Sequence, residues 1–431
     1  MFDLVLVDRE NKQHILKYDP KDNSVINADD GSSIFEDNVR IKYPIAKAVS
    51  KDNPGRKGNI KRLKISMGLK CNYSCQYCSQ SSFIGTETDT NNEDAKVFLS
   101  NLDKWIRGTP NKIEFWGGEP FVYWSKLKIL VPALKDKFPE AKMSIITNGS
   151  LLNKDKIEFI EKYDIMIAIS HDGPNQKFRG PDPFNDPKIF ASIYNLFKLR
   201  PEKVSFNSVL HAKNYDLEAI WNWFNEKIPN SSVNLEGIVN TYDSFTLGYL
   251  GRFTKAQLME MSDNVFREIV NGKNRFPDLT NTALRFIESL RTHREMLSLG
   301  QKCGMDREDS ISVDLEGNVS TCQNTGLGDH QIGHVDDYKN IALTTATHFS
   351  LREECNSCPV VQLCKGSCMF LNDDFFAQSC WNEYYYNIGI LRAALYMLTG
   401  ALLVSINGDI LRPEFSEEHM KKYPSLAELY S

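Results

Sequence analysis

Between about residue 62 and residue 300, short apolar runs alternate with longer segments that have a helical period. The apolar runs predict six strands: Leu63–Met67, Lys112–Trp116, Lys142–Ile146, Asp164–Ser170, Val204–Leu210 and Val233–Ile238. The segments between them predict five helices: Glu93–Ile106, Lys126–Phe138, Lys154–Tyr163, Lys188–Leu199 and Leu217–Lys227. Strands that alternate with helices require parallel crossovers. This region therefore predicts an α/β barrel or a doubly wound sheet.

The segment before this region has a different pattern. Phe2–Val7 and Gln13–Tyr18 are β-prone, with Asp-Pro, Asp-Asn and Asp-Gly turn signals between and after them. We expect residues 1–60 to form a small β-rich region. Two further helical stretches complete the α/β unit of residues 61–300: Lys255–Asn271 and Asn281–Leu299.

The last third of the chain is predicted to contain a metal-dependent segment and a helical tail. Residues 301–385 are rich in cysteines and turns and poor in long apolar periods, so this segment needs a metal framework to fold. The most apolar stretch of the chain runs from Ile388 to Ile406 but contains Arg392, and it predicts a buried or interface helix rather than a membrane span. We expect residues 386–431 to be a helical tail.

Composition and charge narrow the function classes. At 431 residues, with 41% hydrophobic and 25% charged residues, the chain is typical of a soluble globular protein of two or three domains. A net charge of −5 gives no electrostatic reason to expect nucleic acid. One basic run is a solvated linker or a seat for an acidic part of a substrate: Arg56, Lys57, Lys61, Arg62 and Lys64. The N-terminus lacks a secretory signal, which predicts a cytoplasmic location, where ten cysteines are metal ligands rather than disulfides.

Four motifs follow the first four predicted strands. They are Cys71-x3-Cys75-x2-Cys78, Gly117-Gly118-Glu119-Pro120, Thr147-Asn148-Gly149 and Ser170-His171-Asp172-Gly173. In parallel barrels the active site collects at the carboxyl ends of the strands. We therefore expect these motifs to converge on one site.

The cysteine triad indicates a particular iron–sulfur chemistry. Three thiolates on one short loop hold only three irons of a cubane, which leaves the fourth iron open to a chelating amine and carboxylate. The triad and the GGEP motif resemble those of the radical S-adenosylmethionine (SAM) superfamily. Over roughly residues 62–300, the resemblance implies a partial (β/α)6 TIM-type barrel in which Cys71, Cys75 and Cys78 ligate the catalytic [4Fe–4S] cluster. It also implies that one electron cleaves SAM to methionine and a 5′-deoxyadenosyl radical.

The same resemblance suggests further SAM contacts. Gly117 and Gly118 would let the backbone approach the methionine part of SAM, and Glu119 would accept from its ammonium group. Tyr77 would lie beside the adenine or act as a packing residue. Other contacts are two polar residues for the ribose and one arginine for the carboxylate, with helix capping and surface exposure as the alternatives: Asn148, Ser170 and Arg179. Asp172 can equally be a turn residue.

The remaining seven cysteines have ordered spacings. They read Cys303-x13-Gly317-x4-Cys322, then Cys355-x2-Cys358-x5-Cys364-x3-Cys368, then Cys380. This pattern resembles the SPASM extension of radical SAM enzymes that modify peptides. The resemblance implies two auxiliary [4Fe–4S] clusters and so three clusters in all. One is ligated by Cys355, Cys358, Cys364 and Cys380, and the other by Cys303, Cys322 and Cys368 with a non-cysteine ligand or an open site. A structural zinc site is the alternative, because Cys-x2-Cys is also zinc spacing.

Three functions fit this resemblance. The first is maturation of a ribosomally made precursor peptide by hydrogen abstraction and an oxidative crosslink. The second is sulfatase maturation, in which an acidic base follows the cysteine equivalent to Cys322; here Gln323 cannot take a proton, which disfavours this reading. The third is a non-catalytic iron–sulfur or zinc scaffold that binds a partner, against which the intact Glu119 motif argues.

The partners and the catalytic base are less defined. Residues 1–60 are too short and strand-rich for a winged-helix module, so a leader peptide would add to an edge of the β-rich region or bind in the barrel mouth. Family resemblance implies a flavodoxin or ferredoxin as the reductant. Three residues near the second cysteine set are candidate bases, with turn or surface roles as the alternative: Asp306, Asp314 and His334.

Overall fold

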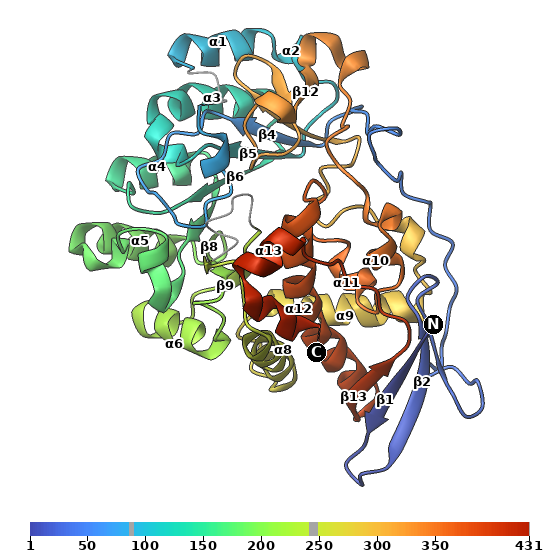
Figure 1. Cartoon of the computed structure of the whole chain (residues 1–431). Coiled ribbons are helices and arrows are strands. Elements are labelled where there is room, and N and C mark those ends of the chain that lie inside the picture. The colour runs from blue at the N-terminus through green and yellow to red at the C-terminus, as the bar shows by residue number, and fades with distance from the viewer. Residues whose placement is uncertain (86–89, 241–248, 431) are drawn as a thin grey trace.

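The computed structural model describes residues 1–85, 90–240 and 249–430, and its centre is a sheet of nine strands (Figure 1). Six of them run parallel in chain order, each paired with the next: β4 (Arg62–Ser66), β5 (Lys112–Trp116), β6 (Lys142–Thr147), β7 (Met166–Ser170), β8 (Val204–Leu210) and β9 (Val233–Ile238). The predicted α/β class and partial TIM-type barrel are confirmed. The bounds of β5, β8 and β9 are those that the apolar runs predicted.

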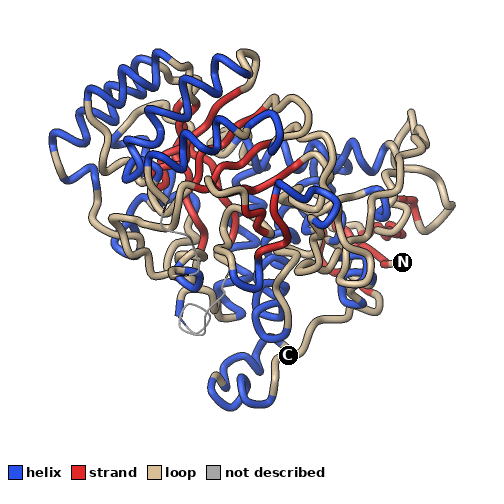
Figure 2. Tube along the Cα trace, turned by 90° about the horizontal axis from the view of Figure 1, so that it is seen from above, coloured by secondary structure: helices blue, strands red, loops and turns tan. Residues whose placement is uncertain are grey.

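Helices flank these strands on the outside (Figures 1 and 2). They are α1 (Asn92–Ser100), α2 (Leu102–Trp105), α3 (Trp124–Lys137), α4 (Lys154–Lys162), α5 (Pro187–Leu199) and α6 (Leu217–Lys227). The single helix expected over Glu93–Ile106 is therefore two helices. Asn101 Nδ2 donates to the carbonyl of Val97 (2.9 Å) and ends α1, while Leu102 and Trp105 of α2 stay buried.

The cysteine-rich region adds three strands that the sequence did not predict. β10 (Ser310–Asp314) pairs in parallel with β4, and β11 (Asn318–Ser320) and β12 (Gln331–His334) follow it antiparallel. Ile311 and Val313 of β10 are fully buried and belong to the main hydrophobic core. Residues 301–385 were expected to depend on a metal framework, and the structure shows that β10 also shares the main hydrophobic core. It continues the sheet of the barrel across residue 300.

A second sheet joins the two ends of the chain. Its order is β13-β1-β2-β3, with β1 (Phe2–Val7), β2 (Gln13–Asp19) and β3 (Ser24–Asn27) from the expected β-rich region. β13 (Leu402–Asn407) comes from the tail that was expected to be helical over residues 386–431, so that prediction is wrong for this strand. The preceding helix, α12 (Asp373–Thr399), ends because Gly400 takes a left-handed conformation with φ 71°.

Three long helices connect the barrel to the cysteine-rich region. α12 packs closely on α8 (Lys255–Val270), and a Cβ on Gly389 would lie 2.5 Å from the carbonyl oxygen of Ser262. α9 (Pro277–Arg291) begins and ends earlier than the expected Asn281–Leu299, with Pro277 in its first turn.

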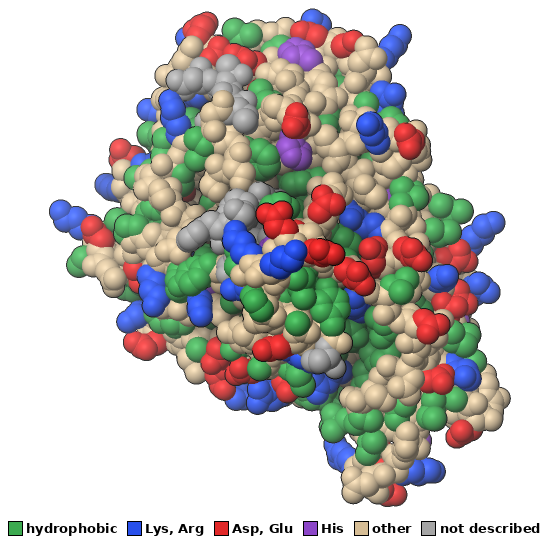
Figure 3. All heavy atoms as spheres, in the orientation of Figure 1, with side chains coloured by type: hydrophobic (Ala, Val, Ile, Leu, Met, Phe, Trp, Pro, Cys, Tyr) green, Lys and Arg blue, Asp and Glu red, His purple; other side chains and the backbone are tan. Residues whose placement is uncertain are grey.

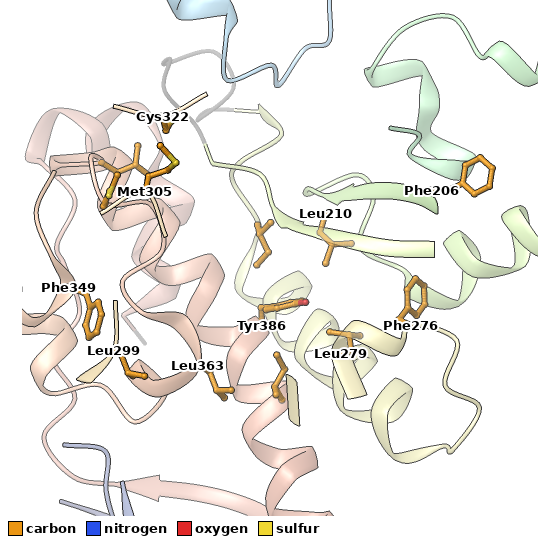
Figure 4. Close-up of a cluster of buried hydrophobic side chains, with 14 of the residues drawn as sticks. Phe206, Leu210, Phe276, Leu279, Leu299, Met305, Cys322, Phe349, Leu363 and Tyr386 are labelled. Carbon is orange, nitrogen blue, oxygen red and sulfur yellow. The ribbon is translucent and has the colours of Figure 1, made fainter. Parts of the chain in front are cut away.

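One continuous core results from this packing. Figure 4 shows buried side chains of the barrel, α9, α12 and the cysteine-rich region, including Phe206, Phe276, Tyr386 and Phe349. Within the described residues, no helix has the length and apolarity needed to cross a membrane.

Candidate active site

The predicted SAM-site residues meet in one cavity at the carboxyl ends of the parallel strands. The cavity has a volume of about 400 Å³. It is lined by every residue predicted for the catalytic cluster and for SAM: Cys71, Cys75, Cys78, Tyr77, Gly117, Gly118, Glu119, Asn148, Ser170 and Arg179. The strand order brings these residues together, because the loops after β4, β5, β6 and β7 are neighbours at one edge of the sheet.

The cysteine loop is anchored to the loop that follows β7. Gln76 N donates to the carbonyl of Phe178 (2.9 Å), and Tyr73 Oη donates to the carbonyl of Pro181 (2.7 Å). Burial raises the pKa of Cys75 to about 12, with a smaller opposing effect of Arg179. The Cys75 thiol is therefore protonated at neutral pH until a metal displaces the proton. Three thiols that share one cavity fit the donor set of a three-cysteine cluster site.

The GGEP motif lies very close to the backbone of the loop that follows β4. A Cβ on Gly118 would lie 2.3 Å from the carbonyl oxygen of Leu69 and 2.5 Å from that of Lys70. Glu119 N donates to the same Lys70 carbonyl (3.0 Å). The structure thus gives Gly118 a further reason, a close approach to the residues just before Cys71, while the expected approach of both glycines to SAM stays a prediction.

Glu119 connects the ends of β5 and β6. Its side chain is 1% exposed; Oε1 accepts from Phe121 N (3.0 Å) and Thr147 Oγ1 (2.7 Å), and Oε2 accepts from Asn148 N (2.8 Å). Burial raises its pKa, and these three hydrogen bonds oppose the rise. A carboxylate has about four lone-pair sites, so Glu119 can accept one more bond, as expected for a contact with an ammonium group.

Tyr77, Asp172 and Arg179 form a buried network beside the cysteine loop. Tyr77 Oη donates to Asp172 Oδ2, Arg179 Nη2 donates to Asp172 Oδ1 (3.1 Å), and Val209 N donates to the same oxygen (3.1 Å). Asp172 is fully buried, so it is not a surface turn residue, and Arg179 is not a surface arginine. Within the described residues the Nε of Arg179 has no partner, which leaves a buried donor for an anionic ligand in the cavity.

Asn148 and Ser170 are also buried at the cavity wall. Asn148 Nδ2 donates to Asn72 Oδ1 (2.9 Å), and its Oδ1 accepts from Ser150, so this side chain ties β6 to the cysteine loop. Ser170 is the last residue of β7 and faces the same cavity.

Four cysteines of the second set line one small hollow. Cys355 and Cys358 come from α10 (Glu353–Asn356) and the turn after it, Cys364 ends α11 (Val361–Cys364), and Cys380 lies on α12. Burial raises the pKa of Cys380 to about 12 and raises that of Cys364 as well. These are the four residues that the resemblance assigned to one complete auxiliary cluster, and their shared hollow fits that donor set.

The other three cysteines come from separate turns. Burial raises the pKa of Cys322 to about 12, with further effects of nearby Cys368 and Cys303. Gly317, between Cys303 and Cys322, has φ 94°, and a Cβ there would lie 2.8 Å from Val335 Cγ2, which explains the glycine in the hairpin before Cys322. Among the described residues, no group of three or more His, Cys, Asp or Glu side chains converges as the ligands of a single metal ion.

Comparison with known proteins agrees with this geometry. Residues 65–216 match the sequence profile of the Radical SAM superfamily. This segment of the chain is therefore a radical SAM domain. The matched segment runs from β4 to the residue before α6 and contains the cysteine loop and all of the motifs at the strand ends.

The chain is similar to a radical SAM cyclopropyl synthase and to a sulfatase-maturating enzyme. The radical SAM cyclopropyl synthase TigE of Paramaledivibacter caminithermalis is 27% identical over 191 residues, which are 41% of this chain and 39% of that protein. The cysteine-type anaerobic sulfatase-maturating enzyme of Clostridium perfringens (strain 13 / Type A) is 23% identical over 342 residues, 70% of this chain and 87% of the relative. The structure of native anSMEcpe with bound AdoMet has a TM-score of 0.55 and 17% identity, covers 78% of this chain and all of its own, and supports the fold.

Gln323 is held against the interior of the radical SAM barrel. Its Oε1 accepts from Lys64 Nζ (2.9 Å), and its carbonyl accepts from Gln80 Nε2 (3.1 Å). Lys64 is buried on β4 and lies 3.6 Å from Glu114 Oε2. Lys57 is buried too and donates to the carbonyls of Met305 (2.7 Å) and Arg307 (3.1 Å). The reading of the basic run as a solvated linker is therefore wrong for these two lysines.

Two of the three candidate bases have structural roles. Asp314 accepts from the backbone of Glu316 (3.0 Å) and of Asn318 (2.9 Å), and the His334 ring bonds the carbonyl of Glu316 (2.9 Å). Asp306 accepts from Gln301 N through Oδ2, while its buried Oδ1 has no partner in the described part of the chain.

Several cavity residues carried no signal in the sequence. Trp116, Glu236 and Asn240 line the cavity. They belong to strands or to the residues next to them, where alternation predicts a position in the sheet but not the chemistry of the inward side chain. Only strand order identifies them.

Proposed function

We propose that this chain is a radical SAM enzyme that forms an oxidative crosslink in a ribosomally made precursor peptide, with one catalytic and two auxiliary [4Fe–4S] clusters. The observation that carries the proposal is the single cavity that collects three thiols, the Glu119 carboxylate and the buried donor of Arg179. The hollow of four further cysteines supports the auxiliary clusters.

Different residues of the cavity would bind the catalytic cluster and SAM. Cys71, Cys75 and Cys78 would ligate the catalytic cluster, Glu119 would accept from the SAM ammonium group, and Arg179 would pair with its carboxylate. When bound, the cluster and SAM together supply a 5′-deoxyadenosyl radical. Asp172 fixes the Arg179 side chain through the 3.1 Å hydrogen bond, so the arginine is oriented before SAM arrives.

The crosslink is an oxidation of the peptide. The peptide loses one hydrogen as an atom, and a second as a proton and an electron, when a new bond joins two of its groups. Cys303, Cys322 and Cys368 would hold the second auxiliary cluster, which when bound would supply an acceptor for that electron. Asp306 is the proposed proton acceptor near it, because Oδ1 of this carboxylate is buried and unpartnered within the described residues.

A relative named as a sulfatase-maturating enzyme, and a solved anSMEcpe structure whose title names a bound peptide, support a peptide substrate. Formylglycine formation is the weaker reading. The side-chain oxygen of Gln323, where those enzymes are expected to have an acidic base, already accepts from Lys64. A cytoplasmic location and a flavodoxin or ferredoxin reductant complete the proposal.

Mass spectrometry of co-expressed candidate peptides tests the reaction. We expect a product that has lost two hydrogens per crosslink and that resists cleavage between the joined residues. A peptide in which cysteine or serine becomes formylglycine would support sulfatase-type maturation instead. A chain that produces no 5′-deoxyadenosine with any peptide would act as a binding scaffold.

The edge of the second sheet is the proposed site for the leader of the precursor. The sheet has two edge strands, β3 from residues 1–60 and β13 from the C-terminal segment, and the proposed site is the β13 edge. Its Leu402 and Val404 are 45% and 59% exposed, and hydrophobic side chains gather over this part of the molecule in Figure 3. An apolar edge strand without charged side chains is a template for an added strand.

A charge on this edge is expected to weaken leader binding. Val404→Lys should raise the Kd for a leader peptide about tenfold, which corresponds to about 1.4 kcal/mol, and should leave SAM cleavage without peptide unchanged. Leu199→Lys is the matched control, because Leu199 is 58% exposed at the end of α5. Fluorescence anisotropy with labelled leader measures both. If Val404→Lys and the wild type bind the leader peptide with equal affinity, the β13 edge is not its binding site, and the barrel mouth becomes the proposed site.

A further inference from the structure

The hollow of Cys355, Cys358, Cys364 and Cys380 is covered by a segment from the end of the chain. We call residues 408–416, between β13 and α13 (Glu417–Lys422), the C-terminal strap. It is fixed at both ends: Leu411 N donates to Ser357 Oγ (3.3 Å), and Ser416 donates to the Asp374 carboxylate through its backbone and its hydroxyl (2.7 Å each). The strap therefore connects the β1–β13 sheet to the start of α12.

Arg412 is the basic residue of this strap, and it lines the hollow together with the four cysteines. Its Nη1 lies 3.5 Å from Cys358 Sγ, and its Cζ lies 3.6 Å from the centre of the Tyr384 ring on α12. Tyr384 thus holds the arginine in place from the other side. The position is set by packing and not by an ion pair.

The charge of Arg412 lacks a protein anion. Among the described residues, its hydrogen-bond partners include no carboxylate: they are the Cys358 sulfur, Cys380, Tyr384 and the Leu411 carbonyl, and its Nη2 is buried with no partner. A buried guanidinium without a carboxylate is costly unless another anion compensates it. The nearby Arg352 also has no carboxylate partner among the described residues: its Nη2 donates to the Leu371 carbonyl (2.6 Å), and its Nε is buried with no partner. Glu354 also lines the hollow, and its negative charge would repel an anionic ligand, whereas Arg412 would attract it.

A cluster with four thiolate ligands is such an anion, and its reduced form carries one more negative charge than its oxidised form. A fixed positive charge at short range stabilises the reduced form more, because the interaction grows with the negative charge and is weakly screened in a buried site.

We propose that Arg412 is a positioning residue that raises the reduction potential of the auxiliary cluster ligated by Cys355, Cys358, Cys364 and Cys380, and that the C-terminal strap holds it there. The proposal rests on the proposed function in one respect, the presence of that cluster. It gives the sheet formed by β1 and β13 a second role, since this sheet anchors the strand from which the strap continues.

Potentiometric titration followed by electron paramagnetic resonance tests the proposal on the full-length, anaerobically reconstituted protein. We expect Arg412→Gln to lower one midpoint potential by about 59 mV, which is a tenfold change in the oxidised-to-reduced ratio for one electron. The shifted couple should be one that persists when Cys71, Cys75 and Cys78 are replaced by alanine. Arg412→Lys, which keeps the charge, should shift it less. Arg392→Gln is the control, because Arg392 lies on α12 but pairs with Asp263.

Iron content separates the outcomes. Full iron with unchanged potentials in Arg412→Gln would overturn the role of Arg412 and leave the auxiliary clusters intact. If Arg412→Gln binds less iron, the Arg412→Lys variant distinguishes an effect of the charge from a loss of the cluster. Full iron and a potential close to the wild type in the lysine variant support the proposal, and equal iron loss in both variants contradicts it. If the wild-type protein binds only about four irons per chain, it has no auxiliary clusters, and this result would contradict the proposed set of cofactors.

Discussion

Replacement of Cys71, Cys75 and Cys78 by alanine is expected to abolish SAM cleavage while the protein stays folded and keeps its auxiliary iron. The three side chains line the cavity and lie outside the hydrophobic core, so their truncation removes ligands and little packing. Iron content should fall from about twelve to about eight per chain, and 5′-deoxyadenosine should fall to the level of a reaction without enzyme. Iron assay and chromatography of the nucleoside products measure both.

The matched control for this variant is Cys380→Ala. It removes a ligand of the four-cysteine hollow and leaves the cavity at the strand ends intact. It should retain SAM cleavage and lose iron. Cleavage that survives in the triple variant would assign the catalytic cluster to other residues.

Gly118→Ala is expected to disable the SAM site through its backbone. The added Cβ would lie 2.3 Å from the Leu69 carbonyl oxygen, and backbone atoms cannot yield as a flexible side chain can. Either the cysteine loop or the GGEP segment must move, and such overpacking typically costs about 1–3 kcal/mol of stability. Since Glu119 follows directly, we also expect SAM to bind at least about tenfold more weakly, which corresponds to about 1.4 kcal/mol. Chemical denaturation and isothermal titration with SAM measure the two effects.

Gly58→Ala is the control for this substitution. Its nearest atom is Glu308 Oε2 at 3.7 Å, so a Cβ fits there without displacement. Stability and SAM affinity of the control should match those of the wild type. A Gly118→Ala variant with equal stability and equal SAM affinity would show that the segment before Cys71 adapts freely, against the close approach described here.

The parallel part of the fold could be predicted because each strand and helix carries its signal locally. β5, β8, β9 and α6 have the predicted bounds, and strong periods fix them. β10 to β12 were missed because three to five residues between turns carry little period, and these strands depend on pairing with one another and, through β10, with β4. β13 was assigned to a helix because its apolar residues follow those of α12, and only the left-handed Gly400 separates them.

Some residues of the candidate site could also be predicted from local sequence, whereas others could not. Motifs after strands identified the cysteines and Glu119, because the parallel topology alone makes those loops neighbours. The roles of Asp172, Lys64 and Arg412 depend on partners far away in the chain. Arg412 contacts Cys358, Lys64 contacts Gln323, and Asp172 contacts Tyr77. No local pattern contains such pairs, so a buried polar network is visible only once the chain is folded.

The most direct test is SAM cleavage by the anaerobically purified, reconstituted full-length chain with dithionite. The account predicts a brown protein that converts SAM to methionine and 5′-deoxyadenosine in equal amounts. A protein that takes up its full iron and leaves SAM intact, or one that stays colourless, would contradict the assignment of this cavity to radical chemistry.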